Sequence, residues 1–304
     1  MQPAITVPER LERTLSQWEG EAGSTWLSAL PSLVEAHLER WGLTAERVCE
    51  PGGQISLVVY VRRADGTPAA LKAGMVTPET AQEHAALAHW AGRGAARLLE
   101  AEPERAVLLL ERLHGDITLR SLPEAKAMLE AAGILQRLWV APPAGHPFRT
   151  VAEHVGGLRE ELRSRRGLPG AADAGALVDE ALEVSAGLLA DAREDHLLHG
   201  DFHHGNVLAA ERFPWLAIDP KPLVGERAYD LAWLVQDRKD TLVGSPGPEA
   251  AVRRRLHRLA ESLEVDRERL RGWTLFRTVE AGLWSLSVGG RASAELFLEF
   301  AGRL

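Results

Sequence analysis

Apolar positions in the first 42 residues recur at helical spacing. In "LPSLVEAHLERWGL", the side chains of Val34, Leu38 and Trp41 fall on one helical face. Pro31 stands where the first turn of a helix tolerates proline, and Gly42 is a typical stop. The pattern therefore predicts helices at the start of the chain, one of them beginning near Pro31 and ending before Gly42.

The pattern then changes to that of short strands. "ISLVVYVRRADGTPAALKAG" predicts two strands joined by a turn at Asp65 and Gly66, and "AARLLEAEPERAVLLLERL" predicts two more. Between the two pairs, "TPETAQEHAALAHW" predicts a helix with Thr77 as its N-cap and Pro78 at its first position. This part of the chain is therefore a sheet with one inserted helix.

From about residue 116 the pattern is mostly helical, and the loop "GSPGP" separates two of the later helices. The expected helices are 122–140, 150–166, 171–192 and several from about 227 to the end. The order predicts an α+β protein with a small β-rich N-terminal lobe, residues 1–112, and a larger helical C-terminal lobe, residues 113–304. A cleft between lobes is a common place for a small-molecule site.

Composition narrows the class of protein. The 304 residues are 45% hydrophobic and 26% charged, as in ordinary soluble proteins, and the net charge of -8 argues against nucleic-acid binding but suits a cationic small molecule. A single cysteine excludes an internal disulfide. No apolar run approaches the ~20 residues of a membrane span, and the N-terminus is unlike a signal peptide. We expect a cytoplasmic protein without a membrane partner; its oligomeric state stays open.

The stretch "LLHGDFHHGNVLAAERFPWLAIDPKP" concentrates candidate chemistry. Five of its side chains are of types that bind zinc: His196, His199, Asp201, His203 and His204. A zinc hydrolase would not, however, require an asparagine at position 206 and a further aspartate at position 219. A zinc site is therefore an alternative rather than the favoured interpretation.

Phosphoryl transfer uses the same stretch more completely. Protein kinases carry H-R-D-x-x-x-x-N, followed after a hairpin by an aspartate that binds magnesium. Here His199 and Asp201 are followed by Asn206, and Asp219 ends the strand "WLAI". In this interpretation Asp201 reaches the substrate hydroxyl, while Asn206 and Asp219 converge on a metal that bridges the phosphates. Because four residue types match at the spacing found in kinases, the pattern is specific for phosphoryl transfer.

Two further expectations concern the nucleotide. A glycine turn between the first two strands should lie over the phosphates, and "EPGGQIS" supplies Gly52 and Gly53. The adenine ring needs a connecting strand, and "AVLLLERLHGD" fits. Backbone groups near Glu111 and Leu113 would then bind the ring.

A lysine is also required, and "AALKAG" places Lys72 in an apolar run, where it needs an anionic partner. The following helix offers Glu79 and Glu83, four residues apart on one face. Glu83 is preferred because it shares its face with Leu87 and Trp90, but the choice stays open.

Together these residues resemble the aminoglycoside phosphotransferase superfamily, and within it the aminoglycoside/hydroxyurea antibiotic resistance kinases of the streptomycin 6-phosphotransferase branch. The resemblance is close over "SLVVYVRRADGTPAALK", "VLLLERLHG" and "NVLAAERFPWLAIDPKPLVGERAYDLAWL", and weaker over "ESLEVDRERLRGWTL". It implies the protein-kinase-like bilobal fold, ATP and Mg²⁺ as cofactors, and resistance through phosphorylation of an aminoglycoside, most closely the 6-hydroxyl of streptomycin. The alternative is a kinase of hydroxyurea, a sugar or another small hydroxylated compound.

By the same resemblance, Asp201 is similar to the catalytic acid/base, Asn206 and Asp219 to the magnesium ligands, and Lys72 to the lysine that holds the α- and β-phosphates. Asp230 in "GERAYDLAW" is similar to the aspartate that braces the catalytic loop. "DPK" replaces the Asp-Phe-Gly of protein kinases, and there is no segment ending in Ala-Pro-Glu. We therefore expect no activity on proteins.

The substrate pocket is the least specified part. Streptomycin carries two guanidinium groups, which call for carboxylates. The candidate substrate residues are His203, Glu226, Asp237, Glu280 and Trp284. A nucleotide-binding module without turnover is a further alternative, although the presence of Lys72, Asp201, Asn206 and Asp219 argues against it.

Overall fold

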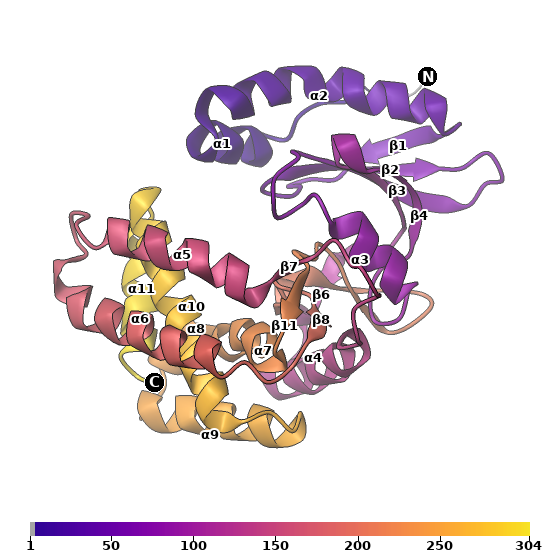
Figure 1. Cartoon of the computed structure of the whole chain (residues 1–304). Helices are drawn as coiled ribbons and strands as arrows, with labels where there is room; N and C mark the ends of the chain where they lie inside the picture. Colours follow the sequence, from indigo (N-terminus) through magenta and orange to yellow (C-terminus); the bar gives the residue numbers. More distant parts are fainter. Residues whose placement is uncertain (1–3) are drawn as a thin grey trace. The chain divides into compact units, whose positions relative to one another are not determined.

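The computed structural model describes residues 4–304 and divides the chain into two compact units (Figure 1). The first unit runs to Thr118 and takes in Leu208–Lys221; the second comprises Leu119–Val207 and Pro222–Leu304. This division differs from the single predicted boundary after residue 112. The reason is strand pairing, since a hairpin from late in the chain completes a small sheet of the first unit.

That small sheet has the order β10-β9-β6. Its strands are β6 (His114–Thr118), β9 (Val207–Ala209) and β10 (Trp215–Ala217). The backbone N–H of Ala96 also donates to the carbonyl of Ala217 at 2.9 Å. The hairpin that ends at Asp219 is thereby fastened to the first unit.

The main sheet of the first unit has five antiparallel strands in the order β1-β2-β3-β5-β4. They are β1 (Thr44–Val48), β2 (Ser56–Arg62), β3 (Pro68–Gly74), β4 (Leu98–Glu102) and β5 (Val107–Glu111). The predicted hairpin is confirmed: β2 and β3 pair from Arg62 opposite Pro68 to Ser56 opposite Gly74. Gly66 has a φ of 84°, which suits the left-handed residue of the turn.

One face of this sheet is covered by α1 (Glu9–Trp18) and α2 (Gly20–Arg40), as Figure 1 shows. Leu57, Val59 and Leu71 point to this face and join the helices in one apolar core. Because side chains alternate along a strand, Lys72 points to the opposite face. The helices thus close one side of the sheet and leave the lysine on the other.

The helix predicted to begin near Pro31 in fact begins at Gly20, and Pro31 lies inside it. An internal proline costs a helix about 3 kcal/mol. The side chains of Leu27, Leu30 and Val34 are all buried against the sheet. Burial of such side chains contributes about 1.5–3 kcal/mol each, which is enough to keep the helix continuous.

The helix predicted from Thr77 begins later, as α3 (Glu83–Trp90). Thr77 caps a turn instead, because its hydroxyl accepts from the backbone N–H groups of Glu79 at 3.3 Å and Thr80 at 3.2 Å. The Thr80 hydroxyl donates to the carbonyl of Met75 at 2.7 Å. These side-chain bonds hold the turn and delay the helix to Glu83.

The second unit is mainly helical. Its elements are α4 (Glu124–Leu138), β7 (Arg149–Thr150), α5 (Val151–Arg165), α6 (Gly175–Ala190), β8 (His196–Leu198), the 3₁₀ turn η4 (His204–Asn206), β11 (Leu223–Gly225), α7 (Arg227–Gln236), α8 (Lys239–Val243), α9 (Pro248–Ser262), α10 (Arg267–Ser287) and α11 (Arg291–Ala301). The predicted helices are confirmed to within a few residues, and "GSPGP" does connect α8 to α9.

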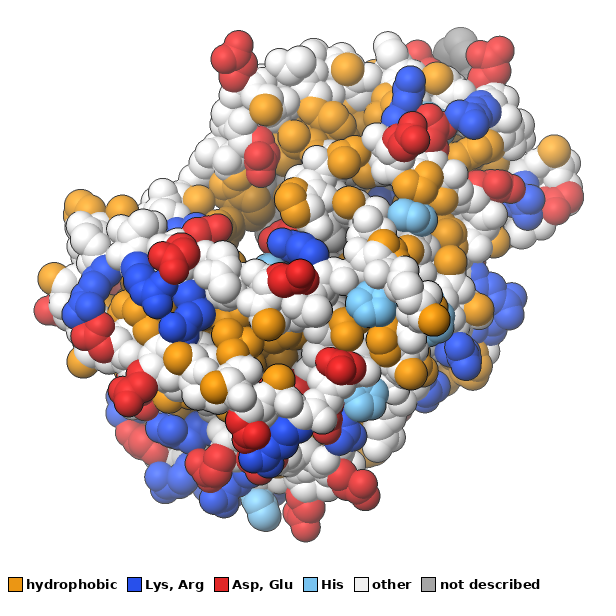
Figure 2. Space-filling model, in the orientation of Figure 1, with side chains coloured by type: hydrophobic (Ala, Val, Ile, Leu, Met, Phe, Trp, Pro, Cys, Tyr) orange, Lys and Arg blue, Asp and Glu red, His pale blue; other side chains and the backbone are white. Residues whose placement is uncertain are grey.

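Helix α10 is the centre of this unit and packs against α6, α7 and α11 (Figure 1). Trp273, Phe276 and Leu283 on it are fully buried. On the surface, α5 and α6 carry charges of both signs (Figure 2). Arg163 pairs with Glu160 within α5, and Arg166, which directly follows α5, pairs with Asp179 of α6. Within residues 4–304, no helix is long and apolar enough to cross a membrane.

Candidate functional site

In the first unit, Lys72, Glu83 and Asp219 form a charged cluster. The Nζ of Lys72 lies 2.6 Å from both carboxylate oxygens of Glu83 and 2.9 Å from Oδ1 of Asp219. Lys72 and Glu83 are buried, whereas the Asp219 side chain is 41% exposed. Burial would lower the pKa of Lys72, but the two carboxylates outweigh it and raise that pKa above its usual value. The lysine is therefore a fixed positive charge.

Of the two glutamates left open, Glu83 is the one that contacts Lys72, because α3 begins at this residue and directs it toward β3. Glu79 lies instead 3.7 Å from Lys221. Asp219 has a φ of 55°, in the left-handed region that few residues other than glycine, asparagine and aspartate adopt readily. The chain holds Asp219 in that conformation at the cluster.

The Lys72–Glu83 pair makes a testable contribution to stability. We expect Lys72→Met to lower the free energy of unfolding by about 3–5 kcal/mol, because it leaves the buried Glu83 carboxylate without its closest cation. Lys72→Met combined with Glu83→Gln should recover part of this loss. Urea unfolding of the three proteins checks it; equal losses in the single and double variants would contradict the assignment.

In the second unit, Asp201 and Asn206 occupy one loop. The Nδ2 of Asn206 donates to the main-chain carbonyl of Asp201 at 3.0 Å, and its backbone N–H donates to the carbonyl of His203 at 2.9 Å. The backbone N–H of Asp201 donates to Nδ1 of the buried His199 at 3.3 Å. His199 thus holds the loop by a hydrogen bond. The segment 199–206 carries the predicted acid/base Asp201 and is called the catalytic loop below.

The buried carboxylate of Asp230 fastens the start of the catalytic loop. It accepts from the backbone N–H groups of His199 at 3.0 Å and Gly200 at 2.8 Å. Gly200 has a φ of 79°, so glycine suits this bend. The resemblance implied such a brace, and these contacts confirm it.

Two further residues of this brace were not predicted. The indole N–H of Trp139 donates to Asp230 at 3.0 Å, and Arg277 donates to the carbonyl of Gly200 at 2.8 Å. Trp139 is a buried residue outside the motifs described above. Arg277 lies in a helix with no motif around it, so the sequence carries no signal for its contact.

Two of the predicted substrate acids are engaged within the protein. Glu226 is buried, with its oxygens 2.5 and 2.6 Å from the guanidinium of Arg269 and 2.6 Å from the indole nitrogen of Trp273. Asp237 is buried against His204 and Arg120. Both contacts argue against a direct role in binding substrate, because a carboxylate that is already paired and desolvated is not available to a ligand.

The other substrate candidates are partly exposed. Glu280 lies 3.3 Å from Arg165, and Trp284 lies on the same helix, α10. Nδ1 of His203 accepts from the backbone N–H of Gly205 at 3.0 Å, which holds the turn before Asn206. For these three residues a substrate role stays a prediction.

The predicted nucleotide residues lie at two places in the first unit. Gly52 and Gly53 lie between β1 and β2, and Gly52 has a φ of 75°. The Glu111 side chain accepts from the backbone N–H of Arg97 at 2.8 Å and from Arg212 at 2.6 Å, so it supports the adjoining backbone. Leu113 is buried in the linking segment between β5 and β6.

Tyr60 ties that linking segment to β2. Its hydroxyl accepts from the backbone N–H of Gly115 at 3.1 Å and lies 3.5 Å from the carbonyl of Leu113. The guanidinium carbons of Arg47 and Arg112 lie 4.6 and 4.7 Å from its ring centroid. A phenol held in this way fixes the backbone next to Leu113.

The contact between Tyr60 and Gly115 can be tested by mutation. A methyl group on Gly115 would overlap the Tyr60 hydroxyl, so Gly115→Ala should cost about 1–3 kcal/mol of stability. Adding Tyr60→Phe removes the hydroxyl and should restore part of it. Gly156→Ala in α5, where a methyl group meets nothing within 4 Å, is the matched control. The coupling is measured by urea unfolding, and strict additivity of the two changes would refute the steric account.

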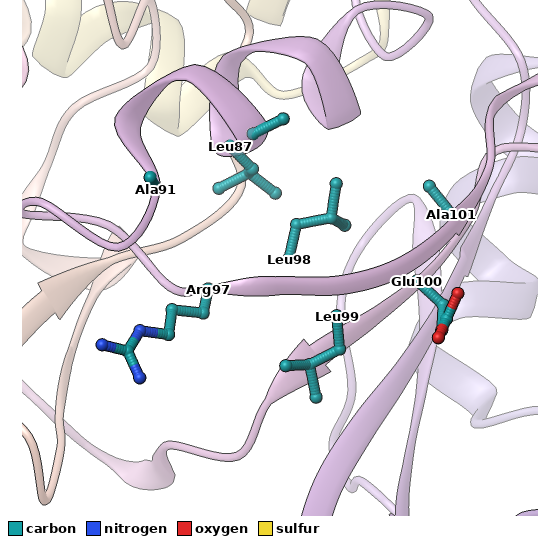
Figure 3. Close-up of a pocket in the computed structure, with 8 residues that line it drawn as sticks. Leu87, Ala91, Arg97, Leu98, Leu99, Glu100 and Ala101 are labelled. Carbon is teal, nitrogen blue, oxygen red and sulfur yellow. The ribbon is translucent and has the colours of Figure 1, made fainter.

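A hollow in the first unit lies elsewhere, between α3 and β4 (Figure 3). It has a volume of about 510 Å³, and Leu87, Arg97, Leu98 and Glu100 are among its lining residues. None of the predicted site residues lines it. Its lining contains one cation, Arg97, and one carboxylate, Glu100, but no lysine and no aspartate.

Asp219 and Asn206 carry oxygen atoms that could bind a metal ion. Within residues 4–304, no three His, Cys, Asp or Glu side chains gather as a metal site of those ligands would require. Asp219 offers a half-exposed carboxylate, and the bond from Nδ2 of Asn206 leaves its amide oxygen as the remaining acceptor. Carboxylate and amide oxygens are ligands that Mg²⁺ accepts, so these residues fit that ion.

The chain is similar in sequence and in fold to known proteins. The sequence model of the aminoglycoside/hydroxyurea antibiotic resistance kinases matches residues 40–289. A streptomycin 6-kinase of Streptomyces glaucescens is 40% identical over 95% of this chain and 93% of its own length. A hydroxyurea phosphotransferase of Kitasatospora aureofaciens is 39% identical over 96% of this chain and 83% of its own length.

Among solved structures, a thermostable mutant of the aminoglycoside phosphotransferase APH(4)-Ia, in ternary complex with ADP and hygromycin B, has a TM-score of 0.63. It is 17% identical and covers 89% of this chain and 97% of that chain. At that identity the likeness shows the fold alone. The predicted α+β fold, with a β-rich N-terminal part and a helical C-terminal part, is thereby confirmed.

Proposed function

The chain belongs to the aminoglycoside/hydroxyurea antibiotic resistance kinase family, and on that premise we propose that it transfers the γ-phosphoryl group of ATP, with Mg²⁺, to the 6-hydroxyl of streptomycin. The observation that carries the substrate is 40% identity to a streptomycin 6-kinase over 95% of the chain. The Lys72–Glu83–Asp219 cluster and the Asp201–Asn206 loop support the chemistry. Such a reaction would confer resistance to the antibiotic.

Lys72, Asp219 and Asn206 have separate roles in the proposed reaction. Lys72, held by Glu83, would be the cation that binds the α- and β-phosphates of ATP. Asp219 and Asn206 would hold Mg²⁺. When bound, the ion neutralises the charge that develops on the phosphate oxygens.

Asp201 is proposed to act on the acceptor hydroxyl. Its carboxylate orients the hydroxyl and takes its proton as the substrate oxygen forms a bond to the γ-phosphorus. The bond from that phosphorus to the β–γ bridging oxygen breaks, and ADP leaves with the electron pair. The bond from Asn206 to the Asp201 carbonyl and the brace from Asp230 keep this carboxylate in place. Positioning of this kind supplies much of the catalysis in phosphoryl transfer.

Hydroxyurea is the second candidate acceptor, because a hydroxyurea phosphotransferase is 39% identical to this chain. The groups proposed for phosphoryl transfer do not separate the two, since they act on the nucleotide and on any acceptor hydroxyl. For streptomycin, Glu280, His203 and Trp284 stay as proposed pocket residues. Glu226 and Asp237 are no longer proposed, for the reasons given above.

Release of ADP tests the proposal. Purified protein with ATP and Mg²⁺ should release ADP when streptomycin is added and much less without it, with hydroxyurea, a sugar and other aminocyclitols as parallel acceptors. Replacing ATP by GTP tests the nucleotide. Stimulation by hydroxyurea alone would transfer the proposal to the second candidate, and no stimulation by any acceptor, with ATP still bound, would remove both.

A further inference from the structure

Helix α7 supplies two carboxylates to the catalytic loop. Asp230 lies in its first turn, and Asp237 follows its last residue, Gln236. Seven residues are about two helical turns, so the two side chains fall on nearly the same side of the helix. Asp230 holds His199 and Gly200 at the start of the loop. Asp237 contacts the other end of the loop, near Asn206.

The Asp237 carboxylate binds the turn that ends at Asn206. Its Oδ2 accepts from the backbone N–H of His204 at 2.7 Å and lies 3.0 Å from Nδ1 of the same residue. His204 is fully buried and opens the 3₁₀ turn η4, whose last residue is Asn206. The carboxylate is therefore hydrogen-bonded to the backbone of the turn and lies against the His204 ring.

The remaining oxygen is held from other directions. Oδ1 accepts from Arg120 at 3.0 Å and from the backbone N–H of Arg238 at 2.9 Å, while Arg255 donates to the main-chain carbonyl at 2.5 Å. Burial would raise the pKa of Asp237, but the bonds from His204 and the charge of Arg120 outweigh it and hold that pKa well below its usual range. The carboxylate is charged, buried and fully engaged.

The stability of α7 does not explain why an aspartate stands at its C-terminus. A negative charge at the C-terminus of a helix lies at the unfavourable end of the helix dipole. The position is instead occupied by an aspartate whose bonds go to the catalytic loop and to two arginines. What the arrangement does stabilise is the backbone that carries Asn206.

We propose that Asp237 is a positioning residue for Asn206: with His204 it fixes the turn that sets the amide oxygen toward Mg²⁺. The inference rests on the proposed function, because it takes Asn206 as a magnesium ligand. Residues that orient metal ligands typically change metal affinity or activity about 10- to 100-fold when they are altered.

The test is Asp237→Asn, which keeps the size of the side chain but turns one of its two acceptor atoms into a donor, so that either His204 or Arg120 loses its partner. The Mg²⁺ concentration for half-maximal ADP release should rise about 10- to 100-fold. Binding of ADP without Mg²⁺, measured by calorimetry, should stay close to wild type. Asp240→Asn, an exposed aspartate on α8, is the matched control and should leave both quantities unchanged.

A second variant covers the case in which Asp237→Asn does not fold. Arg120→Gln removes the more exposed partner of the carboxylate and should shift the Mg²⁺ dependence in the same direction by a smaller factor. Wild-type Mg²⁺ dependence in the variants that fold would overturn the inference, as would an equal loss of ADP binding with and without Mg²⁺. If the wild-type protein releases no ADP with any acceptor, the proposed function is wrong. The role of Asp237 is then decided separately, by comparing how ADP binding depends on Mg²⁺ in the wild type and in the variants.

Discussion

Asp201→Asn should lower kcat for phosphorylation of streptomycin by about 10²- to 10⁴-fold, the usual contribution of a general base. The amide keeps the size of the carboxylate but does not accept the hydroxyl proton. Because Asn206 contacts Asp201 through the main-chain carbonyl, the loop bonds should survive the change. Steady-state rates of ADP release with streptomycin measure the effect.

Binding and stability are the controls for this variant. The affinity for ADP and the midpoint of thermal unfolding should both stay near wild type, because the side chain of Asp201 is proposed to act on the acceptor and not on the nucleotide. A variant that retains more than a tenth of the wild-type kcat would contradict the assignment of Asp201 as the base.

Asp219→Asn should lower kcat at least about a hundredfold, since a metal ion contributes several kcal/mol to transition-state stabilisation. The change also takes one of two carboxylates from Lys72. Asparagine tolerates the left-handed backbone found at this position, where φ is 55°, so the loss should be one of chemistry and not of folding.

The rate should be followed over a series of Mg²⁺ concentrations, with partial recovery expected at the highest. Asp116→Asn is the matched control in the same unit, because that side chain is 81% exposed and lies 3.7 Å from its nearest cation, Arg47. A hundredfold loss in both variants would indicate a general effect, and wild-type rates in Asp219→Asn would exclude it as a metal ligand.

The parts of the fold that could be predicted are those decided by local pattern. The β2–β3 hairpin follows from alternating apolar residues around Asp65 and Gly66, and its register is the one that such a turn sets. The choice of Glu83 over Glu79 likewise followed from a shared helical face with apolar neighbours. In both cases the information lies within a few residues.

Predictions failed where tertiary packing overrides local preference. Pro31 indicated a helix start, but burial of the surrounding leucines keeps α2 continuous through it. The hairpin 208–221 belongs to the first unit because it pairs with β6, about 90 residues earlier in the chain. Contacts over such distances carry no signal in one sequence.

The residues of the candidate site likewise fall into those that a local motif identifies and those whose contacts only the structure shows. Asp201, Asn206 and Asp219 stand at fixed spacings, so a motif finds them. Glu226 and Asp237 were candidates only as acids in helices near the motif, and their partners Arg269 and Arg120 are far away in the chain. Whether an acid meets an arginine or a substrate is decided by the packed structure, which is also what assigns Asp237 to the catalytic loop.

Identification of the product is the most direct test of the central claim. Wild-type protein with ATP, Mg²⁺ and streptomycin should yield ADP and streptomycin that carries one phosphate group, and phosphorus–proton correlation in the NMR spectrum should place that phosphate on the 6-hydroxyl. Asp201→Asn should form this product about 10²- to 10⁴-fold more slowly under the same conditions. Unmodified streptomycin after prolonged incubation with active, ATP-binding protein would contradict the account, and a phosphate on another hydroxyl would contradict the proposed position of transfer.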